Sequence, residues 1–168
     1  MKAAKVWTIV LCTTGLILVA AAQNAGEDKA PPQPVPFSHK HHAGTLKLEC
    51  KTCHPSPDPG ESMTIAPPTV CMQCHATVKT DSPHIQKVAA AAKSGTPLPW
   101  ARVYTIPGYV FFSHRAHLEK QNTCEECHGP VATREKLWRE SNLTMGTCMD
   151  CHRAKKASVD CTFCHEAR

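Results

Sequence analysis

The chain has 168 residues, 42% of them hydrophobic but only 5% aromatic, and it carries 14 prolines and 11 cysteines. This composition indicates one small domain with a modest side-chain core, which excludes a protein held together by a large apolar interior. The formal net charge of +5 at pH 7 has no localised basic stripe behind it, so nucleic acid is excluded as a partner.

Residues 1–22 have the pattern of a signal peptide. Two lysines precede an apolar run over residues 6–20, and three alanines at 20–22 offer a cleavage site. An N-terminal membrane anchor is the alternative, because an apolar run of roughly 17 residues lies at the lower edge of spanning length. We favour cleavage, which removes the two lysines and lowers the formal charge from +5 to +3. Either way we expect the rest of the chain in the periplasm, membrane-anchored in the second case.

Residues 23–36 are polar and then rich in proline. This composition predicts a semi-rigid, extended spacer, and an ordinary unstructured terminus is an equal alternative.

Five copies of Cys-x-x-Cys-His follow the spacer and use ten of the eleven cysteines. They are Cys50/Cys53/His54, Cys71/Cys74/His75, Cys124/Cys127/His128, Cys148/Cys151/His152 and Cys161/Cys164/His165. In this motif two thiols add to the vinyl groups of a haem, and the adjacent imidazole binds the iron as the proximal ligand. Zinc ribbons or a disulfide scaffold would explain the cysteines but not the histidine after every pair. We therefore predict five covalently bound haem c groups.

Covalently bound haems would stabilise such a chain in place of a large side-chain core. Each is bonded to the chain twice, so it fills the interior and also staples it, as disulfides or metals do in small folds. We expect a small, mostly irregular and loop-rich fold with a few short α-helices, in which the haems form the core. Their propionates also turn the sequence charge negative, which favours weakly bound redox proteins, soluble or at a surface, as partners.

The pattern Phe-Ser-His-x-x-His occurs twice before a haem motif, at residues 37–42 and 112–117. The haem motifs that follow repeat at nearly the same offset, from Cys50 to Cys124 and from Cys71 to Cys148. We interpret this as an internal duplication of a two-haem module. The modules span 37–80 and 99–152, joined by a helical linker at 81–98, and residues 153–168 add the fifth haem. The pentahaem domain as a whole is 37–168.

Each module thus supplies two histidines that can bind the far side of an iron. These predicted distal ligands are His39, His42, His114 and His117. If the segment is helical, histidines three residues apart attach only ~5–6 Å apart, so the two haems must lie close together. His41 lacks a counterpart, and we expect it beside solvent or a propionate.

Three further elements are expected between the motifs. Ser82 to Lys93 reads as a helix, with a capping serine, a proline at its start and Gly95 beyond its end. Its His84 is expected at the surface. Residues 100–112 hold much of the aromatic content, with a turn at Pro107-Gly108, and are expected to pack on porphyrin faces. Residues 131–141 read as a second short helix.

The fifth iron has no duplicated distal histidine. Met145 stands three residues before Cys148, and a thioether can bind an iron and raise its potential. The alternative is that Met145 only fills apolar space. Two further possibilities for the fifth iron are His84 as its second histidine ligand and a sixth position that stays open.

The two Phe-x-His-x-x-His segments before Cys-x-x-Cys-His resemble those of class III (cytochrome c3/c7-like) multihaem cytochromes c. The stretches 99–103, 107–117, 127–129, 143–146 and 148–153 more specifically resemble the pentahaem subunit of alternative complex III and its relatives. This resemblance implies electron transfer beside a membrane quinol-oxidising or other respiratory complex. It also strengthens the expectation that Met145 is an axial ligand.

We therefore expect an electron carrier rather than an enzyme, passing single electrons along close-packed haems between a quinol-linked membrane donor and a redox partner. A reductase would need one iron with an open face, and no Cys-x-x-Cys-Lys motif of the nitrite reductase type is present. A protomer of a polymeric cytochrome filament is the third possibility.

Overall fold

The computed structural model describes residues 26–56 and 60–166, so the predicted signal peptide and Cys12 lie outside the described residues. Short helices joined by long loops make up this part of the chain, and no strand occurs in it. Within the described ranges, no helix is both long and apolar enough to cross a membrane. The expectation of a loop-rich fold with a few short helices is confirmed.

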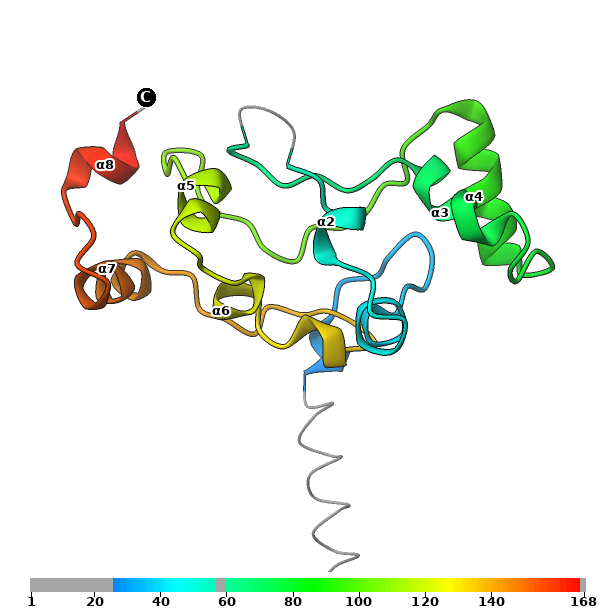
Figure 1. Cartoon of the computed structure of the whole chain (residues 1–168), viewed down its shortest axis with the longest axis horizontal. Helices are drawn as coiled ribbons and strands as arrows, with labels where there is room; N and C mark the ends of the chain where they lie inside the picture. Colours follow the sequence, from blue (N-terminus) through cyan, green and yellow to red (C-terminus); the bar gives the residue numbers. More distant parts are fainter. Residues whose placement is uncertain (1–25, 57–59, 167–168) are drawn as a thin grey trace, which may run out of the picture.

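Each Cys-x-x-Cys-His motif lies on or at the end of its own short helix. These helices are α2 (Cys50–Cys53), α3 (Pro68–His75), α6 (Cys124–His128), α7 (Met145–Ala154) and α8 (Cys161–His165). A helical turn brings residues three apart to one face, so both thiols of a motif face the same side. Along the longest axis of the molecule α3, α2, α6 and α7 follow one another, and α8 lies above α7 at the same end (Figure 1).

The two Phe-Ser-His-x-x-His segments also become helical. His114 begins α5 (His114–Glu119), with Ser113 as its N-cap. His39 is the N-cap of η2 (Lys40–Thr45), a wider turn of the π type. The condition behind the predicted close approach of two haems is therefore met in both copies.

The helix predicted from Ser82 to Lys93 is confirmed as α4 (Pro83–Ser94). Pro83 occupies its first turn, and Gly95 ends it in the left-handed conformation at φ 69°. Ser82 is the N-cap residue, but its side chain makes no capping hydrogen bond. Val88 on this helix is buried with Val35 and Leu98, and α3 packs against α4 beside them.

The helix predicted over residues 131–141 is wrong. Only η3 (Val131–Thr133) forms, a single 3-10 turn, and Arg134 is already extended. Contacts distant in sequence replace the helical hydrogen bonds: the backbone N–H groups of Glu140 and Ser141 both donate to the hydroxyl of Tyr104, at 3.1 and 3.2 Å. The Arg134 guanidinium also donates two hydrogen bonds of 2.8 Å to the Glu140 carboxylate.

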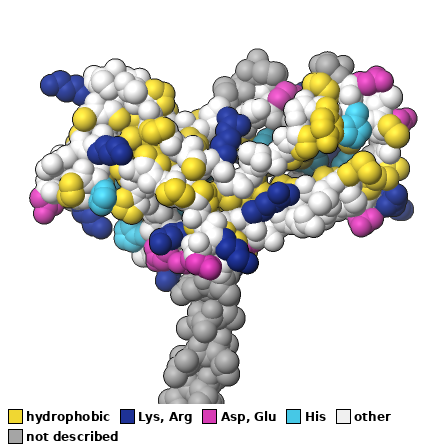
Figure 2. Space-filling view, turned by 180° about the vertical axis from the view of Figure 1, so that it is seen from behind, with side chains coloured by type: hydrophobic (Ala, Val, Ile, Leu, Met, Phe, Trp, Pro, Cys, Tyr) yellow, Lys and Arg dark blue, Asp and Glu magenta, His cyan; other side chains and the backbone are white. Residues whose placement is uncertain are grey.

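The predicted turn at Pro107-Gly108 is present, with the N–H of Val110 donating to the carbonyl of Pro107 at 3.0 Å. The apolar core of side chains is small. Among the described residues, Val35, Val88, Leu98 and Trp138 are the buried hydrophobic ones. Figure 2 shows hydrophobic and histidine side chains spread over the surface of one face rather than gathered inside. Side chains alone therefore give this fold little interior, as the composition predicts.

Candidate functional site

The two duplicated segments place their aromatic rings in the same way. Phe37 meets His39 edge-on at a centroid distance of 4.9 Å and stacks on His42 at 4.4 Å. Phe112 meets His114 edge-on at 4.8 Å and stacks on His117 at 4.4 Å. One phenylalanine thus packs against both histidines of its segment, which fixes the direction of two imidazoles at once.

The serine of each segment makes the matching polar contacts. The hydroxyl of Ser38 accepts the N–H of His41 at 2.9 Å, and that of Ser113 accepts the N–H of Ala116 at 3.1 Å. Each serine carbonyl also contacts Nδ1 of the second histidine. The distances are 2.9 Å for Ser38 and His42, and 2.7 Å for Ser113 and His117. The repeated sequence therefore encodes a repeated local geometry.

Three predicted distal histidines each face a motif histidine. The ring centroids of His39 and His54 are 6.3 Å apart. The same distance is 6.2 Å for His42 and His75, and 6.0 Å for His117 and His152. An imidazole nitrogen binds a first-row metal at about 2.0–2.1 Å, so rings on opposite sides of one metal have centroids roughly 6 Å apart. The three pairs are therefore spaced to hold one iron each.

His114 and His128 form the fourth combination. Burial lowers the pKa of His128, and the nearby charges of His114 and then His54 lower it further. In the first module burial, followed by His54 and His42, lowers the pKa of His39 to about 4. Both shifts favour the neutral imidazole, which is the form that binds a metal.

Backbone carbonyls orient the motif histidines. Nδ1 contacts a carbonyl oxygen in four of them: His54 with Thr64 at 3.1 Å, His75 with Val78 at 3.0 Å, His152 with Ser158 at 2.6 Å and His165 with Tyr109 at 3.1 Å. A carbonyl oxygen can only accept, so Nδ1 carries the proton and Nε2 is left with its lone pair. This is the arrangement that prepares an imidazole to bind a metal through Nε2.

The motif cysteines differ in how far they are enclosed by protein. Partly buried thiols are those of Cys53, Cys71, Cys127 and Cys164, and exposed ones are those of Cys50, Cys74, Cys124, Cys148, Cys151 and Cys161. All ten are free of disulfide bonds, in contrast to the alternative of a disulfide scaffold.

The second motif shows this difference within one pair. Cys71 packs against the small core of Val35, Val88 and Leu98, whereas Cys74 on the same helix α3 is exposed. The attachment of haem at Cys71 and Cys74 stays a prediction.

The fifth motif is built differently from the other four. The ring that packs near His165 belongs to Tyr109, at a centroid distance of 5.9 Å, and the backbone carbonyl of Tyr109 holds Nδ1 of the same histidine. Met145, the predicted sixth ligand, is the first residue of α7, and 68% of its surface is exposed. Sequence reasoning did not single out Tyr109, because only its place after the Pro107-Gly108 turn marks it.

The remaining histidines lie outside these pairs. His41 meets the ring of His42 edge-on at 5.5 Å. His84 is exposed on the first turn of α4. In the aromatic stretch before α5, Tyr104 meets the ring of His128 edge-on at 4.8 Å, and Trp100 packs against the small core. Tyr104 and Tyr109 therefore contact motif histidines, although the prediction that the stretch packs on porphyrin faces stays a prediction.

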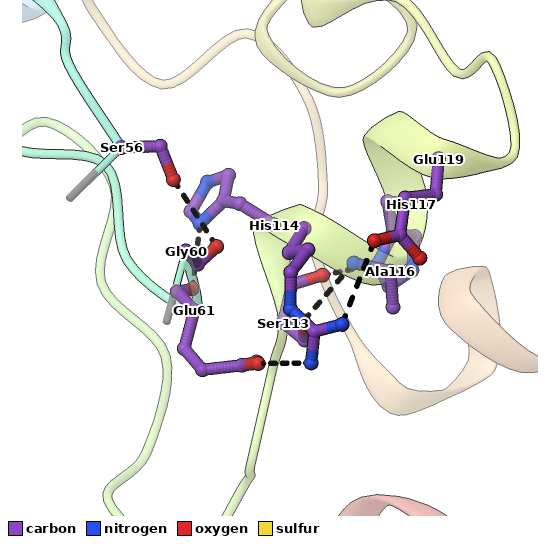
Figure 3. Close-up of polar contacts among 9 residues, drawn as sticks. Ser56, Gly60, Glu61, Ser113, His114, Ala116, His117 and Glu119 are labelled. Carbon is purple, nitrogen blue, oxygen red and sulfur yellow. Dashed lines mark hydrogen bonds and ion pairs between the residues drawn. The ribbon is translucent and has the colours of Figure 1, made fainter. Parts of the chain in front are cut away.

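Sequence reasoning missed two glutamates that bind the duplicated segments. The carboxylate of Glu61 accepts a hydrogen bond of 2.9 Å from Arg115, and its backbone carbonyl accepts the N–H of His114 at 3.1 Å. Hydrogen bonds from Ser113 and then Arg115 lower the pKa of Glu61. Figure 3 shows Glu61 facing Ser113 and His114. We call these contacts the Glu61 junction.

A second set, the Glu135 junction, holds the other segment. Glu135 forms an ion pair of 3.6 Å with Lys40, and hydrogen bonding from Ser38 is the main cause that lowers the pKa of Glu135. The N–H of Lys40 donates to the carbonyl of Arg134 at 2.8 Å. Glu61 follows His54 by the same interval at which Glu135 follows His128, which is the sequence signal that could have revealed them.

The donor set fits haem better than a single shared metal ion. Each motif offers two thiols and one imidazole, and in three cases a second imidazole faces the first at the spacing one iron requires. The residues that could hold the fifth iron are His165 and, as a prediction only, Met145.

Comparison with known proteins gives matches to both halves of the chain. Residues 17–98 match the model of the class III cytochrome C family, and residues 110–166 match that of cytochrome c7 and related cytochrome c. A curated relative is the multiheme cytochrome c subunit of menaquinone reductase from Nitratidesulfovibrio vulgaris strain Hildenborough. It is 29% identical over an alignment 161 positions long, and the match covers 80% of this chain and 77% of the relative.

Proposed function

We propose that this chain, which matches class III cytochromes c in its first half and cytochrome c7 in its second, is a periplasmic pentahaem conduit for electron transfer. It would pass single electrons between a quinol-linked membrane donor and a redox partner outside the membrane. The observation that carries this proposal is the spacing of three histidine pairs, at centroid distances of 6.0–6.3 Å.

The proposed ligand set follows from that spacing. The ten cysteines of the five motifs attach the haems, and His54, His75, His128, His152 and His165 bind the irons from the proximal side. His39, His42, His114 and His117 bind four of them from the distal side, in pairs with His54, His75, His128 and His152. Covalently bound haem c is the cofactor of this family, and the number five is our proposal from the motifs.

The protein's own residues serve this role by holding ligands still. Haem iron supplies reversible one-electron chemistry when bound. The backbone carbonyls keep Nδ1 protonated, so Nε2 remains the donor atom. Phe37 and Phe112 restrain two imidazoles each, which limits ligand movement when the charge changes. With imidazoles on both sides, four sites leave no position for a substrate, which supports a carrier rather than an enzyme.

The membrane partner is proposed from the relative. The name of that protein assigns it to a menaquinone reductase as its multiheme cytochrome c subunit. By analogy, we propose that this chain works beside a respiratory complex that reacts with a membrane quinone. Soluble or surface redox proteins would be its other partners, and nucleic acid would not be among them. Periplasmic location, with or without a membrane anchor, is proposed from residues 1–22.

A reductase with one open haem is the second candidate, and the fifth motif is the observation that favours it. The ring near His165 is that of Tyr109, and Met145 is largely exposed. If Met145 does not bind the fifth iron, a small ligand could reach it.

Intact mass and spectroscopy of the exported protein test the proposal together. We expect a mass increase of five haems and EPR signals from low-spin iron. We also expect the haems to be reduced by a menaquinol analogue only when solubilised host membranes are present. Fewer than five haems would refute the pentahaem assignment. Reduction at the same rate without membranes would remove the quinol-linked donor, and ready binding of nitrite or cyanide would favour the reductase.

A further inference from the structure

The Glu61 and Glu135 junctions are reciprocal. Each loop that follows the first haem motif of one module holds the distal-histidine segment of the other module. The carbonyl of Gly60 accepts the N–H of Arg115 at 2.9 Å, and the carbonyl of Arg134 accepts that of Lys40 at 2.8 Å. Arg115 and Lys40 are equivalent residues of the duplication, as are Gly60 and Arg134. The two modules are thus joined as the halves of a symmetric dimer would be.

The arrangement of helices agrees with an approximate two-fold relationship. In Figure 1, α2 and α6 lie near the middle, and α3 and α7 lie on opposite sides of them. The blue to cyan coil of η2 lies below on the right, and α5 lies above on the left. A two-fold relationship of this kind brings the first motif of each module to the centre and sends the second motif of each outward.

Thiols of neighbouring motifs give an independent set of contacts. The thiol of Cys124 lies within interaction range of the thiol of Cys50. These two thiols belong to the first and third motifs, so those motifs touch at the centre of the molecule. The imidazole of His54 likewise lies within interaction range of that of His128.

The same kind of contact connects the other motifs. The thiol of Cys53 in the first motif lies within interaction range of Cys71 in the second. Cys127 of the third motif is likewise near Cys151 of the fourth, and Cys148 of the fourth is near Cys164 of the fifth. Each contact joins helices that are neighbours in Figure 1, with α8 lying above α7 at one end of the long axis.

We propose that the haem sites form one line in the spatial order second, first, third, fourth and fifth motif. The line crosses from one module to the other between Cys50–His54 and Cys124–His128. Its ends are Cys71–His75, beside α4, and Cys161–His165, on α8. The second and third motifs, although consecutive in the sequence, are separated by the first. Electrons therefore enter and leave at α3 and α8, at opposite ends of the molecule.

This inference rests on the proposed pentahaem function, and its test is separate. Haem proton signals in the fully reduced, diamagnetic protein give nuclear Overhauser cross-peaks between adjacent haems. We expect cross-peaks between the first and third haems, and none between the second and third. The pairs within one module, first with second and third with fourth, are the positive controls. Cross-peaks between the second and third haems, or controls present without a first-to-third cross-peak, would overturn the order.

Two single substitutions assign the signals and repeat the test. His42→Ala should make the second haem paramagnetic, with loss of cross-peaks to one neighbour, the first haem. His114→Ala should do so at the third haem, with loss of cross-peaks to two neighbours, the first and the fourth. Loss of cross-peaks to two neighbours in His42→Ala would contradict the terminal position of the second motif. Haem count by mass is measured first. A missing haem would refute the proposed pentahaem function, and the spatial order would then be tested on the haems that remain.

Discussion

The imidazole rings of His39 and His54 are almost parallel, with an interplanar angle of 3° at a centroid distance of 6.3 Å. The other two pairs are turned, by 53° for His42 with His75 and by 48° for His117 with His152. The two sites of the first module therefore share ligand spacing but differ in ligand orientation. The second sites of the two modules agree in both spacing and orientation.

This difference predicts distinct EPR signals from the oxidised protein. Parallel imidazole planes split the iron orbitals strongly and give an ordinary rhombic low-spin spectrum, whereas turned planes shift the largest g value upward. We expect His39→Ala to remove the rhombic signal and His42→Ala to remove a signal of the shifted kind. A shifted signal lost with His39→Ala would show that the ring angles change when haem binds.

Replacement of His117 by alanine tests the distal ligands. We expect one haem to become high-spin or water-ligated, because His152 loses the imidazole that faces it. Covalent attachment should stay intact, since the thioether bonds depend on cysteines. The matched control is His84→Ala, an exposed histidine outside the pairs, which should leave optical and EPR spectra unchanged. Unchanged spectra in His117→Ala would remove this histidine from the ligand set.

Gly60→Ala tests how the Glu61 junction positions His114. Gly60 has φ +83°, and a Cβ there would lie 3.1 Å from Cβ of Arg115. We expect a loss of about 1–2 kcal/mol in the free energy of unfolding, because a left-handed backbone is costly for alanine. The EPR signal of the third site should change and that of the fourth should not. Gly108→Ala is the control, since Gly108 lacks a positive φ and has no neighbour within 4 Å. An effect as large in the control would disconnect the junction from His114.

The pair of Arg134 and Glu140 should matter to stability. Two hydrogen bonds of 2.8 Å join the side chains, which are only 11% and 18% exposed. We expect Glu140→Gln to lower the free energy of unfolding by about 1–3 kcal/mol, because it leaves a charged group incompletely paired. Glu119→Gln, at an exposed ion pair with Arg115, should cost well under about 1 kcal/mol. Soret-region circular dichroism during denaturation measures both, and equal losses would contradict the role of burial.

Met145→Ala decides how the fifth iron is completed. We predict that the highest of the five potentials falls and that one haem becomes high-spin, because a thioether ligand raises the potential of its iron. A redox titration followed optically measures this. The control is Met63→Ala, at a methionine eight residues before Cys71 that we expect to be apolar filler, and it should change no potential. If all five potentials stay in place, the thioether assignment is wrong, and a high-spin haem in the unmodified protein would then favour the reductase.

Local signals made part of this structure predictable. The limits of α4 follow from Pro83 at its start and Gly95 at its end, which act on the backbone within one turn. The motif helices and the paired geometry of the two Phe-Ser-His-x-x-His segments likewise follow from residues close in sequence. Such features need no knowledge of the rest of the chain.

Contacts distant in sequence account for the failures. Residues 134–141 do not form a helix, because their backbone groups bind Lys40 and Tyr104 instead. The position of Tyr109 beside His165 depends on how two loops meet in space. The reciprocal junctions could not be predicted from single residues, since the sequence around an exposed glutamate does not reveal which side chain it will contact. Only their matching positions after a motif histidine connect Glu61 with Glu135.

The reciprocal junctions also set an order of events during synthesis. The segment with His39 and His42 is synthesised early, but Arg134 and Glu135, which hold the start of that segment, are synthesised only after the third Cys-x-x-Cys-His motif. Closing that large a loop is slow and entropically costly. The first half of the chain therefore stays loosely held until the second half is present, and the two halves mature together. A chain interrupted near its middle would keep its early haems attached yet imperfectly ligated, and would be open to proteolysis in the compartment that receives it.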